Sequence, residues 1–251
     1  MIAATVRAHD PDRFFTALFA PPEKRDTLLA LYAFNHELAR AREVVSAPHL
    51  ALIRLHWWRE VVQGTPKRHP VADAIAHFVA DGTLPAPDLL AIIDAREAEA
   101  DAEISTLAEW RAYLLGTAGG LMVAAARLLG AVEPEAVRPL GAAYGAAGVL
   151  RAAPVLARAG RCLLPADVLA AHGLSPEAVV SGADPSAAIR ELIAEGRAFL
   201  RPLALPRAVI ACALPAVLAR RDLARLPGPA WPRGLGDKLA VGWAAWRGRI
   251  G

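Results

Sequence analysis

Signals that begin and end α-helices recur along the whole sequence, and they leave room for few folds. Pro21 and Pro22 stand before a stripe of apolar residues at helical spacing. Thr106 and Glu109 form a capping box, the pair of side chains that satisfies the first turn of a helix. No segment alternates polar and apolar residues for long enough to indicate a strand. The sequence therefore predicts an all-α protein.

The expected helices follow one another without a linker, an internal repeat or a low-complexity run between them. With 251 residues, 55% of them hydrophobic and 21% charged, the chain is long enough for one core and short for two. We therefore expect a single domain over residues 1–251. Helices are expected over 22–45, 48–64, 71–81, 88–103, 106–129, 134–157, 185–200 and 207–225, the last with a kink at Pro215.

Charge and cysteine content exclude several classes of protein. A formal charge of +3, from 28 basic and 25 acidic residues, is too small to indicate nucleic-acid binding. Cys162 and Cys212 form neither a C-x-x-C pair nor a disulfide framework, which favours a reducing compartment. The first ten residues lack the apolar stretch of a secretory signal, and the uncharged segment 114–126 is too short to span a bilayer. We expect a cytoplasmic protein.

Common catalytic signatures are missing from the sequence. It contains no G-x-x-x-x-G-K-[ST], no G-x-S-x-G and no H-E-x-x-H, so nucleotide binding, serine hydrolysis and zinc-dependent proteolysis are not indicated. The seven histidines are scattered, and the one regular pair, His49 and His56, has no third ligand nearby in the sequence. The histidines therefore indicate no metal site.

Two segments carry a resemblance to a known family. Residues 32–43 read Tyr-Ala-Phe-Asn-His-Glu-Leu-Ala-Arg-Ala-Arg-Glu, and residues 144–165 begin Tyr-Gly-Ala-Ala-Gly-Val-Leu-Arg and end Arg-Cys-Leu-Leu-Pro. Their order and spacing resemble the signature segments of the squalene/phytoene synthase family, and the likeness extends over nearly the whole chain. The resemblance implies a prenyl-synthase helical bundle around a central cavity. For active members it also implies head-to-head joining of two prenyl diphosphates with magnesium.

Acidic residues of the family are mostly missing from the matched positions. Diphosphate leaves an allylic carbon only when its charge is neutralised, and carboxylates hold the magnesium ions that do so. The matched positions are Ala39, Arg40 and Glu43 in the first segment and Ala152, Val155 and Leu156 in the second. Only Glu43 keeps an acid. The resemblance thus predicts degenerate motifs, no catalytic residue and no metal or other cofactor; magnesium is expected only if the protein is an active synthase.

Basic residues remain near these degenerate motifs. A guanidinium group binds phosphate through two parallel hydrogen bonds, so an anion site is expected from Arg40, Arg151, Arg158 and Arg161. Alternatively, Arg151 and Arg161 pair with buried acids such as Asp167 or cap helix carbonyls. The residues expected to line the central cavity are Tyr32, His36, Glu99, Tyr113 and Tyr144.

The C-terminal segment 232–250 combines tryptophan with basic residues. Trp243 and Trp246 lie among Lys238, Arg247 and Arg249, a pattern that suits an amphipathic helix at a membrane surface. A helix that docks back onto the bundle gives the same pattern. If the segment contacts membrane, the protein is peripheral on the inner membrane face.

Three functions are compatible with these residues. The degenerate motifs with arginine replacements are similar to the branch of the family that contains the mitochondrial complex I assembly factor and its α-proteobacterial relatives. This likeness implies a non-catalytic scaffold whose partner is a membrane protein or respiratory-complex subunit, and it allows side chains to fill the cavity. An active prenyltransferase requires at least two acids that face each other across the cavity. A metal-free binder of prenyl diphosphate or phospholipid headgroups requires the arginines to converge on an open apolar pocket.

Overall fold

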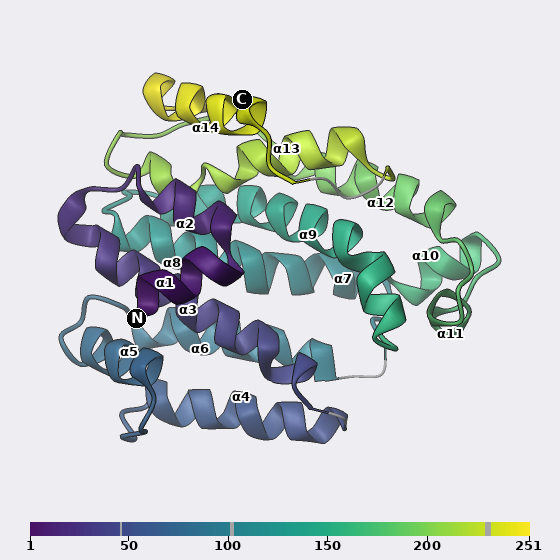
Figure 1. The fold of residues 1–251 in the computed structure, drawn as a ribbon, viewed down its shortest axis with the longest axis horizontal. Coiled ribbons are helices and arrows are strands. Elements are labelled where there is room, and N and C mark those ends of the chain that lie inside the picture. Colours follow the sequence, from purple (N-terminus) through teal and green to yellow (C-terminus); the bar gives the residue numbers. More distant parts are fainter. Residues whose placement is uncertain (46, 101–102, 229–231) are drawn as a thin grey trace.

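The computed structural model describes residues 1–45, 47–100, 103–228 and 232–251 (Figure 1). Within these residues the chain forms fourteen α-helices and one antiparallel pair of two-residue strands, β1 and β2, so the all-α prediction is confirmed. The helices are α1 Ile2–His9, α2 Pro11–Ala17, α3 Pro22–Glu43, α4 Pro48–Val62, α5 Pro70–Ala80, α6 Ala86–Arg96, α7 Leu107–Leu114, α8 Gly120–Leu128, α9 Arg138–Arg158, α10 Ala166–Ala171, α11 Pro176–Val180, α12 Ser186–Ala198, α13 Pro215–Arg225 and α14 Leu235–Arg247. The strands are β1 Leu203–Ala204 and β2 Arg249–Ile250.

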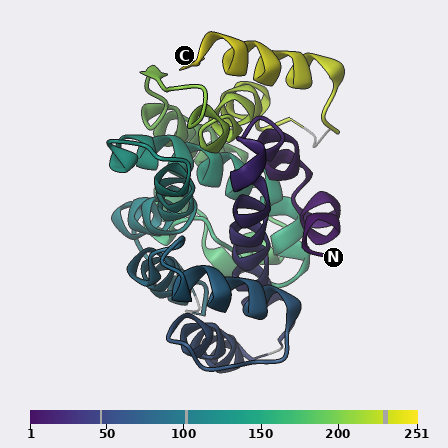
Figure 2. The same ribbon diagram turned by 90° about the vertical axis from the view of Figure 1, so that its left-hand side faces the viewer.

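Two long helices, α3 and α9, organise the packing. Helix α3 contacts α1, α4, α5 and α8, whereas α9 contacts α7, α8, α12 and α13. In Figure 1, α4 lies along one edge of the molecule and α14 along the opposite edge, with α3 and α9 between them, and the turned view in Figure 2 agrees. The apolar stripe expected on α3 is buried, as Leu28, Leu31 and Tyr32 illustrate. Tyr144 of α9 packs against both apolar clusters of the interior and so joins them.

Proline and capping residues set most helix starts, as the sequence indicates. Helices α3 and α13 begin at Pro22 and Pro215, where the missing amide hydrogen costs nothing. The capping box of Thr106 and Glu109 is present at the start of α7. The kinked helix expected over 207–225 is wrong, because the chain forms only a short 3-10 turn at Ile210–Cys212 before Pro215 begins α13.

Other departures from the expected helices are local. The helix expected over 88–103 ends at Arg96, and the chain continues as a 3-10 turn, Glu97–Ala100. Because a 3-10 turn aligns residues three apart, Glu99 lies against Arg96. Residues 101–102 of the expected helix lie outside the described residues. The helix expected over 134–157 begins with a 3-10 turn, Pro134–Val137, and α1, α2 and the β1–β2 pair were not anticipated. Strands of two residues are too short to leave an alternation pattern.

Close contact between two helix backbones explains the glycines of the central region. The segment expected as one helix over 106–129 is α7 and α8 joined by a π-turn, Leu115–Gly119. A Cβ atom added to Gly119 would lie 2.9 Å from the carbonyl oxygen of Arg138, and one added to Gly141 would lie 2.5 Å from that of Ala118. The π-turn and α9 therefore cross at a separation that only glycine permits.

Among the described residues, one helical segment is long and apolar enough to cross a membrane by length and composition alone. It is Pro134–Arg158, which comprises α9 and the 3-10 turn before it. Because α9 packs against α7, α8, α11, α12 and α13, its place in the core accounts for its apolar composition.

We expect Gly141→Ala to lower the free energy of unfolding by about 1–3 kcal/mol, because the added methyl group would meet the backbone of the π-turn. Gly148→Ala, on the same helix, is the matched control. Nothing lies within 4 Å of its added carbon, so the gain in helix propensity should raise the free energy of unfolding by up to about 1 kcal/mol. Urea unfolding followed by circular dichroism measures both, and effects of the same sign would contradict the close crossing.

Candidate functional site

The positions expected to be degenerate motifs lie in the last turns of α3 and α9. On α3, Ala39 and Arg40 are partly buried and Glu43 is exposed. The Arg40 guanidinium lies 3.7 Å from Glu37 Oε1, one turn back on the same helix. Arg40 thus has an acidic partner on α3 itself.

On α9 the corresponding positions carry small and apolar side chains. Ala152 and Leu156 are partly buried, and Val155 is exposed. These groups offer no oxygen to a cation. Across the described residues, no group of three or more His, Cys, Asp or Glu side chains is placed to hold a metal ion.

A buried polar cluster centred on Glu99 joins several elements of the interior. Glu99 Oε1 accepts hydrogen bonds from the Tyr113 hydroxyl (2.7 Å) and from Arg96, and Oε2 pairs with Arg161 (3.4 Å). Arg96 also donates to Asn35 Oδ1 on α3 (3.2 Å). Burial, reinforced by the charge of Glu99, raises the pKa of Tyr113, so the hydroxyl stays protonated and remains a donor. Two expected cavity residues, Glu99 and Tyr113, therefore bond directly to each other.

The charge state of this cluster limits its chemistry. Both oxygens of Glu99 are engaged by guanidinium groups, and the Arg96 guanidinium is buried beside it. A carboxylate held in this way is already neutralised, so a divalent ion would first have to displace two ion pairs in a region of low dielectric. The cluster serves as a structural ion pair in the middle of the bundle.

A second cation, Arg13, lies between two of the expected cavity tyrosines. Its guanidinium carbon is 5.8 Å from the ring centroid of Tyr32 and 4.7 Å from that of Tyr144. Asp10, the N-cap of α2, accepts a hydrogen bond of 2.8 Å from the same guanidinium. The two aromatic faces and one carboxylate thus stabilise a buried charge without solvent.

His36, another expected cavity residue, is held in its neutral form. Its ring stacks on that of His9 with centroids 4.5 Å apart, and its Nε2 is buried without a hydrogen-bond partner. Burial and the neighbouring His9 lower the pKa of His36, and Arg40 adds to this, whereas Glu37 and Asp10 act in the opposite direction. The His36 imidazole is therefore uncharged at neutral pH.

The four arginines proposed as an anion site bond to four different partners. Arg40 pairs with Glu37 and Arg161 with Glu99, as described above. Arg151 donates to Asp222 Oδ2 (3.1 Å), and Arg158 Nε donates to the carbonyl of Pro154 (3.2 Å). Arg151 and Arg161 thus both pair with buried acids, which is the first of the two alternatives expected for them. The suggested partner was wrong, however, because Asp167 is exposed and caps α7 by accepting from the Leu107 amide (3.0 Å).

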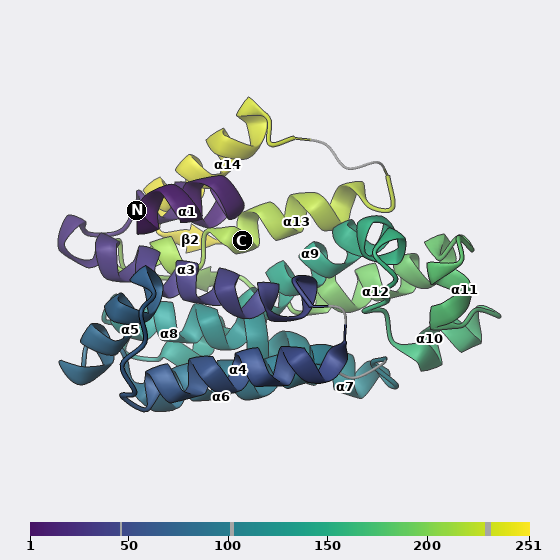
Figure 3. The ribbon, with the colours of Figure 1, turned by 60° about the horizontal axis from the view of Figure 1, so that its bottom comes forward.

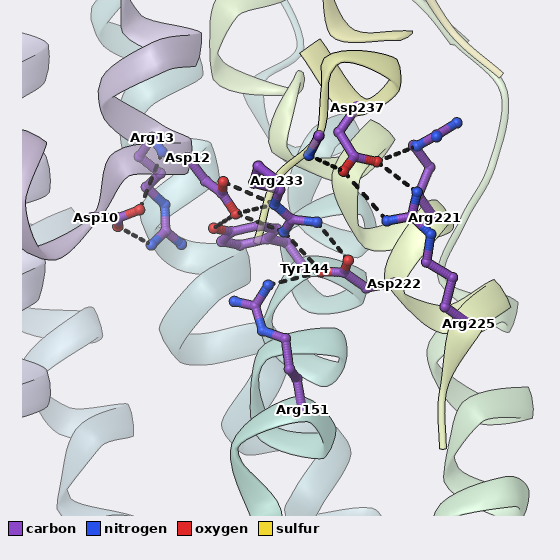
Figure 4. A network of polar contacts seen from close by, with 11 residues as sticks. Asp10, Asp12, Arg13, Tyr144, Arg151, Arg221, Asp222, Arg225, Arg233 and Asp237 are labelled. Carbon is purple, nitrogen blue, oxygen red and sulfur yellow. Dashed lines mark hydrogen bonds and ion pairs between the residues drawn. The ribbon is translucent and has the colours of Figure 1, made fainter. Parts of the chain in front are cut away.

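A network of ion pairs that the sequence did not reveal lies between α2, α9 and α13 (Figure 4). Arg233, just before α14, donates to Asp12 Oδ2 (2.6 Å) and to Asp222 Oδ1 (2.5 Å), so its guanidinium lies between two buried carboxylates. The Tyr144 hydroxyl donates to Asp12 (3.3 Å), and Arg151 approaches Asp222 from α9. The network connects residues more than two hundred positions apart.

Asp237 anchors α14 to this region. Its carboxylate accepts from Arg221 Nε (2.5 Å), lies 3.0 Å from Arg225 and accepts from the Gly234 amide (3.1 Å). Burial alone would raise the pKa of Asp237, but the hydrogen bonds from the two arginines and the amide outweigh it and lower the pKa to about 2. The side chain is therefore ionised at any physiological pH.

One feature of the sequence could have indicated this network, although it was not used. Asp222 is the single acid between Glu195 and Asp237, in a stretch that contains many arginines. An isolated carboxylate among several cations on an otherwise apolar helix is a candidate for a buried ion pair. Beside the network lies a cleft of about 720 Å³, whose lining combines the charged side chains of Arg151, Arg233 and Lys238 with Phe14 and Leu218.

The fold and the placement of the two signature segments define an all-helical protein of the prenyl-synthase type. The family model for squalene/phytoene synthase matches residues 6–230, and the chain belongs to this family. Two solved structures share the fold. A dehydrosqualene synthase in complex with a ligand has a TM-score of 0.76 at 14% identity and covers 98% of this chain and 94% of that chain. Squalene synthase HpnC from Alicyclobacillus acidocaldarius has a TM-score of 0.62 at 17% identity, over 98% and 92%.

Curated relatives carry two different names. NADH dehydrogenase (ubiquinone) complex I, assembly factor 6, is 31% identical in Mus musculus and 29% identical in Homo sapiens, in each case over 68% of this chain and 54% of the relative. Phytoene synthase of Rhodobacter capsulatus is 27% identical over 68% of this chain and 53% of that protein. The chain thus matches about half the length of these relatives.

We expect Glu99→Gln to lower the free energy of unfolding by about 3 kcal/mol, because it leaves the buried Arg96 and Arg161 without their counter-charge. The matched control is Glu195→Gln, which breaks the more exposed ion pair with Arg111 and should cost less than about 1 kcal/mol. Denaturant unfolding of the two variants gives the comparison. Equal losses would contradict the assignment of Glu99 as the buried counter-ion.

A pH dependence follows from His36. Its pKa in the folded chain lies below the value of 6.5 for a free imidazole, so as the pH falls the unfolded chain binds the proton first. The stability associated with His36 is therefore complete above pH 6.5 and is lost as the pH falls from there toward the lowered pKa. His36→Phe keeps the stacked ring and removes this titration.

The measurement is the melting temperature of each variant at about pH 7.5 and about pH 5.5. The fall between these two values should be smaller for His36→Phe than for the unsubstituted protein. His49→Gln, at an exposed position, should leave the fall unchanged. An identical fall in all three proteins would show that His36 is protonated as readily in the folded chain as in the unfolded one.

Proposed function

We propose that the chain is a non-catalytic, assembly-type factor that acts on subunits of a respiratory NADH dehydrogenase complex. The names of its assembly-factor relatives support this role. The sequence matches to these relatives cover about two thirds of the chain. The proposed place of action is the inner face of the membrane, where such subunits are inserted. The family fold would then serve as a scaffold for a membrane-protein partner.

The observation that carries the proposal is the state of Glu99. It is the one carboxylate among the expected cavity residues, and Arg96 and Arg161 together occupy both of its oxygens. Ionisation of an allylic diphosphate needs free carboxylates that gather magnesium around the leaving group. A carboxylate that already neutralises two arginines does not supply this.

Asp12 and Asp222, the two acids that face each other in the ion-pair network, are also neutralised. Asp12 and Asp222 approach the same point from α2 and α13, as an active synthase would require of its acids. Arg233 lies between them and balances their charge together with Arg151. The metal-free binder has weaker support than the scaffold, because its four candidate arginines are directed to separate partners.

Deletion of the gene in the source organism tests the proposal. We expect less assembled NADH dehydrogenase complex on native gels and unchanged levels of squalene- or phytoene-type products, because the chain assists assembly and forms no prenyl product. Expression of the chain should restore the complex, whereas expression of an active squalene or phytoene synthase should not. A loss of isoprenoid product that either protein restores would establish the enzyme instead.

Purified protein provides the biochemical counterpart of this experiment. Incubated with farnesyl or geranylgeranyl diphosphate and magnesium, it should release no diphosphate above the rate without protein, because the carboxylates that would bind the ions are absent or paired. An active squalene synthase assayed alongside confirms that the conditions support turnover. Turnover by this chain that requires magnesium would disprove the scaffold role as stated.

A further inference from the structure

Helix α14 presents a continuous apolar stripe to solvent. Its side chains are spaced four, four and three residues apart, so they lie on one face of the helix. Their exposed fractions are 72%, 63%, 58% and 62% for Leu235, Leu239, Trp243 and Trp246. Single exposed apolar residues are common, but four in one row form a patch of the kind that marks an interaction site. We refer to these four residues as the α14 stripe.

The α14 stripe is not exposed because α14 has detached from the core. The opposite side of α14 is packed against the molecule through Val241, Ala244 and Ala245, and Asp237 fixes it to Arg221 of α13. The helix therefore docks onto the bundle and still keeps its tryptophans outside. Figures 1 and 3 place α14 at the outer edge of the molecule, where a flat surface can reach it.

Cationic groups lie directly beside the α14 stripe. A hollow of about 410 Å³ is lined in part by Trp243, by Arg220, Arg221, Arg247 and Arg249, and by Gly251. In the part of the chain that the structure describes, no carboxylate pairs with Arg220, Arg247 or Arg249. Asp237 is the only acid in residues 232–251, and its charge is already taken up by α13. We refer to this hollow as the arginine hollow.

From the α14 stripe and the arginine hollow we infer a docking surface for an anionic phospholipid bilayer. Tryptophan and leucine side chains enter the boundary between headgroups and acyl chains, and the tilted pair of Trp243 and Trp246, with ring centroids 5.0 Å apart, presents its rings there. Arginines bind the lipid phosphates, which would supply a counter-charge to Arg220, Arg247 and Arg249.

Charge decides between a lipid surface and the other occupants. A second copy of this chain would bring the same arginines against each other, which opposes association through this face. A protein partner would need to be both acidic and apolar over the whole stripe, whereas an anionic bilayer has both properties everywhere. The inference goes beyond the proposed assembly role and does not depend on it.

Flotation of the full-length protein with vesicles tests this inference. One set of vesicles contains equal parts of phosphatidylcholine and phosphatidylglycerol, and the other contains phosphatidylcholine alone. We expect binding to the anionic vesicles to be at least about tenfold tighter than to the neutral ones and to weaken with added salt. Equal binding to both sets, or binding to neither, would overturn the inference.

Substitutions separate the two parts of the surface. Trp243→Ser with Trp246→Ser should reduce binding to anionic vesicles by at least about tenfold, and Arg247→Gln with Arg249→Gln should remove most of the preference for phosphatidylglycerol. Both pairs are exposed, so the melting temperature should change little. Ile53→Ser, which removes an equally exposed apolar group on α4, is the control and should bind as the unsubstituted protein does.

Two further results would contradict the inference. The first is vesicle binding that survives the tryptophan substitutions. The second is a dimer in analytical ultracentrifugation that the same substitutions dissolve, which would make a second copy the occupant. The flotation experiment uses only protein and lipid, so absence of vesicle binding would overturn the lipid surface and leave the assembly role intact. Vesicle binding together with a negative deletion experiment would support the lipid surface and overturn the assembly role.

Discussion

A charged side chain in a protein interior is stable only beside an opposite charge, and this requirement organises the centre of the molecule. Arg96 is buried against Glu99, Arg13 against Asp10, and Arg233 between Asp12 and Asp222. The first two pairs lie within one turn of the chain, whereas Arg233 joins Asp12 of α2 to Asp222 of α13. The polar contacts therefore fix the register of α2, α9 and α13, while burial of apolar surface supplies most of the driving force for folding.

The same requirement bears on chemistry. A carboxylate can neutralise a magnesium ion or an arginine, and Glu99, Asp12 and Asp222 in the described interior each pair with an arginine. Arginine is permanently charged and covalently attached, so it satisfies the acids without any bound ion. This neutralisation is the physical basis of the proposed scaffold role.

The sequence indicated the helices better than the site. Pro22 and the capping box at Thr106 mark helix starts through local contacts, which spacing along the chain reveals. The π-turn before Gly120 depends instead on how closely α9 approaches, and Pro215 was interpreted as a kink when it begins a helix. Asp222 has two partners, Arg233 and Arg151, and their spacing along the sequence does not predict that they meet. Long-range ion pairs follow from tertiary packing, so sequence patterns can suggest the charged residues but not the pairs.

The ion-pair network and the inferred lipid surface share one residue, Arg221. It lines the arginine hollow and also donates to Asp237, so a lipid phosphate in the hollow would compete with Asp237 for the same guanidinium. Asp237 would keep its contact with Arg225 and the amide of Gly234, and the apolar contacts of Val241 would persist. Helix α14 would then stay docked when lipid binds, with its tryptophans held at a fixed angle to the bundle. A surface positioned in this way would orient the whole molecule on a membrane, because Asp237 holds α14 to α13 and Arg233, just before α14, pairs with Asp12 of α2 and Asp222 of α13.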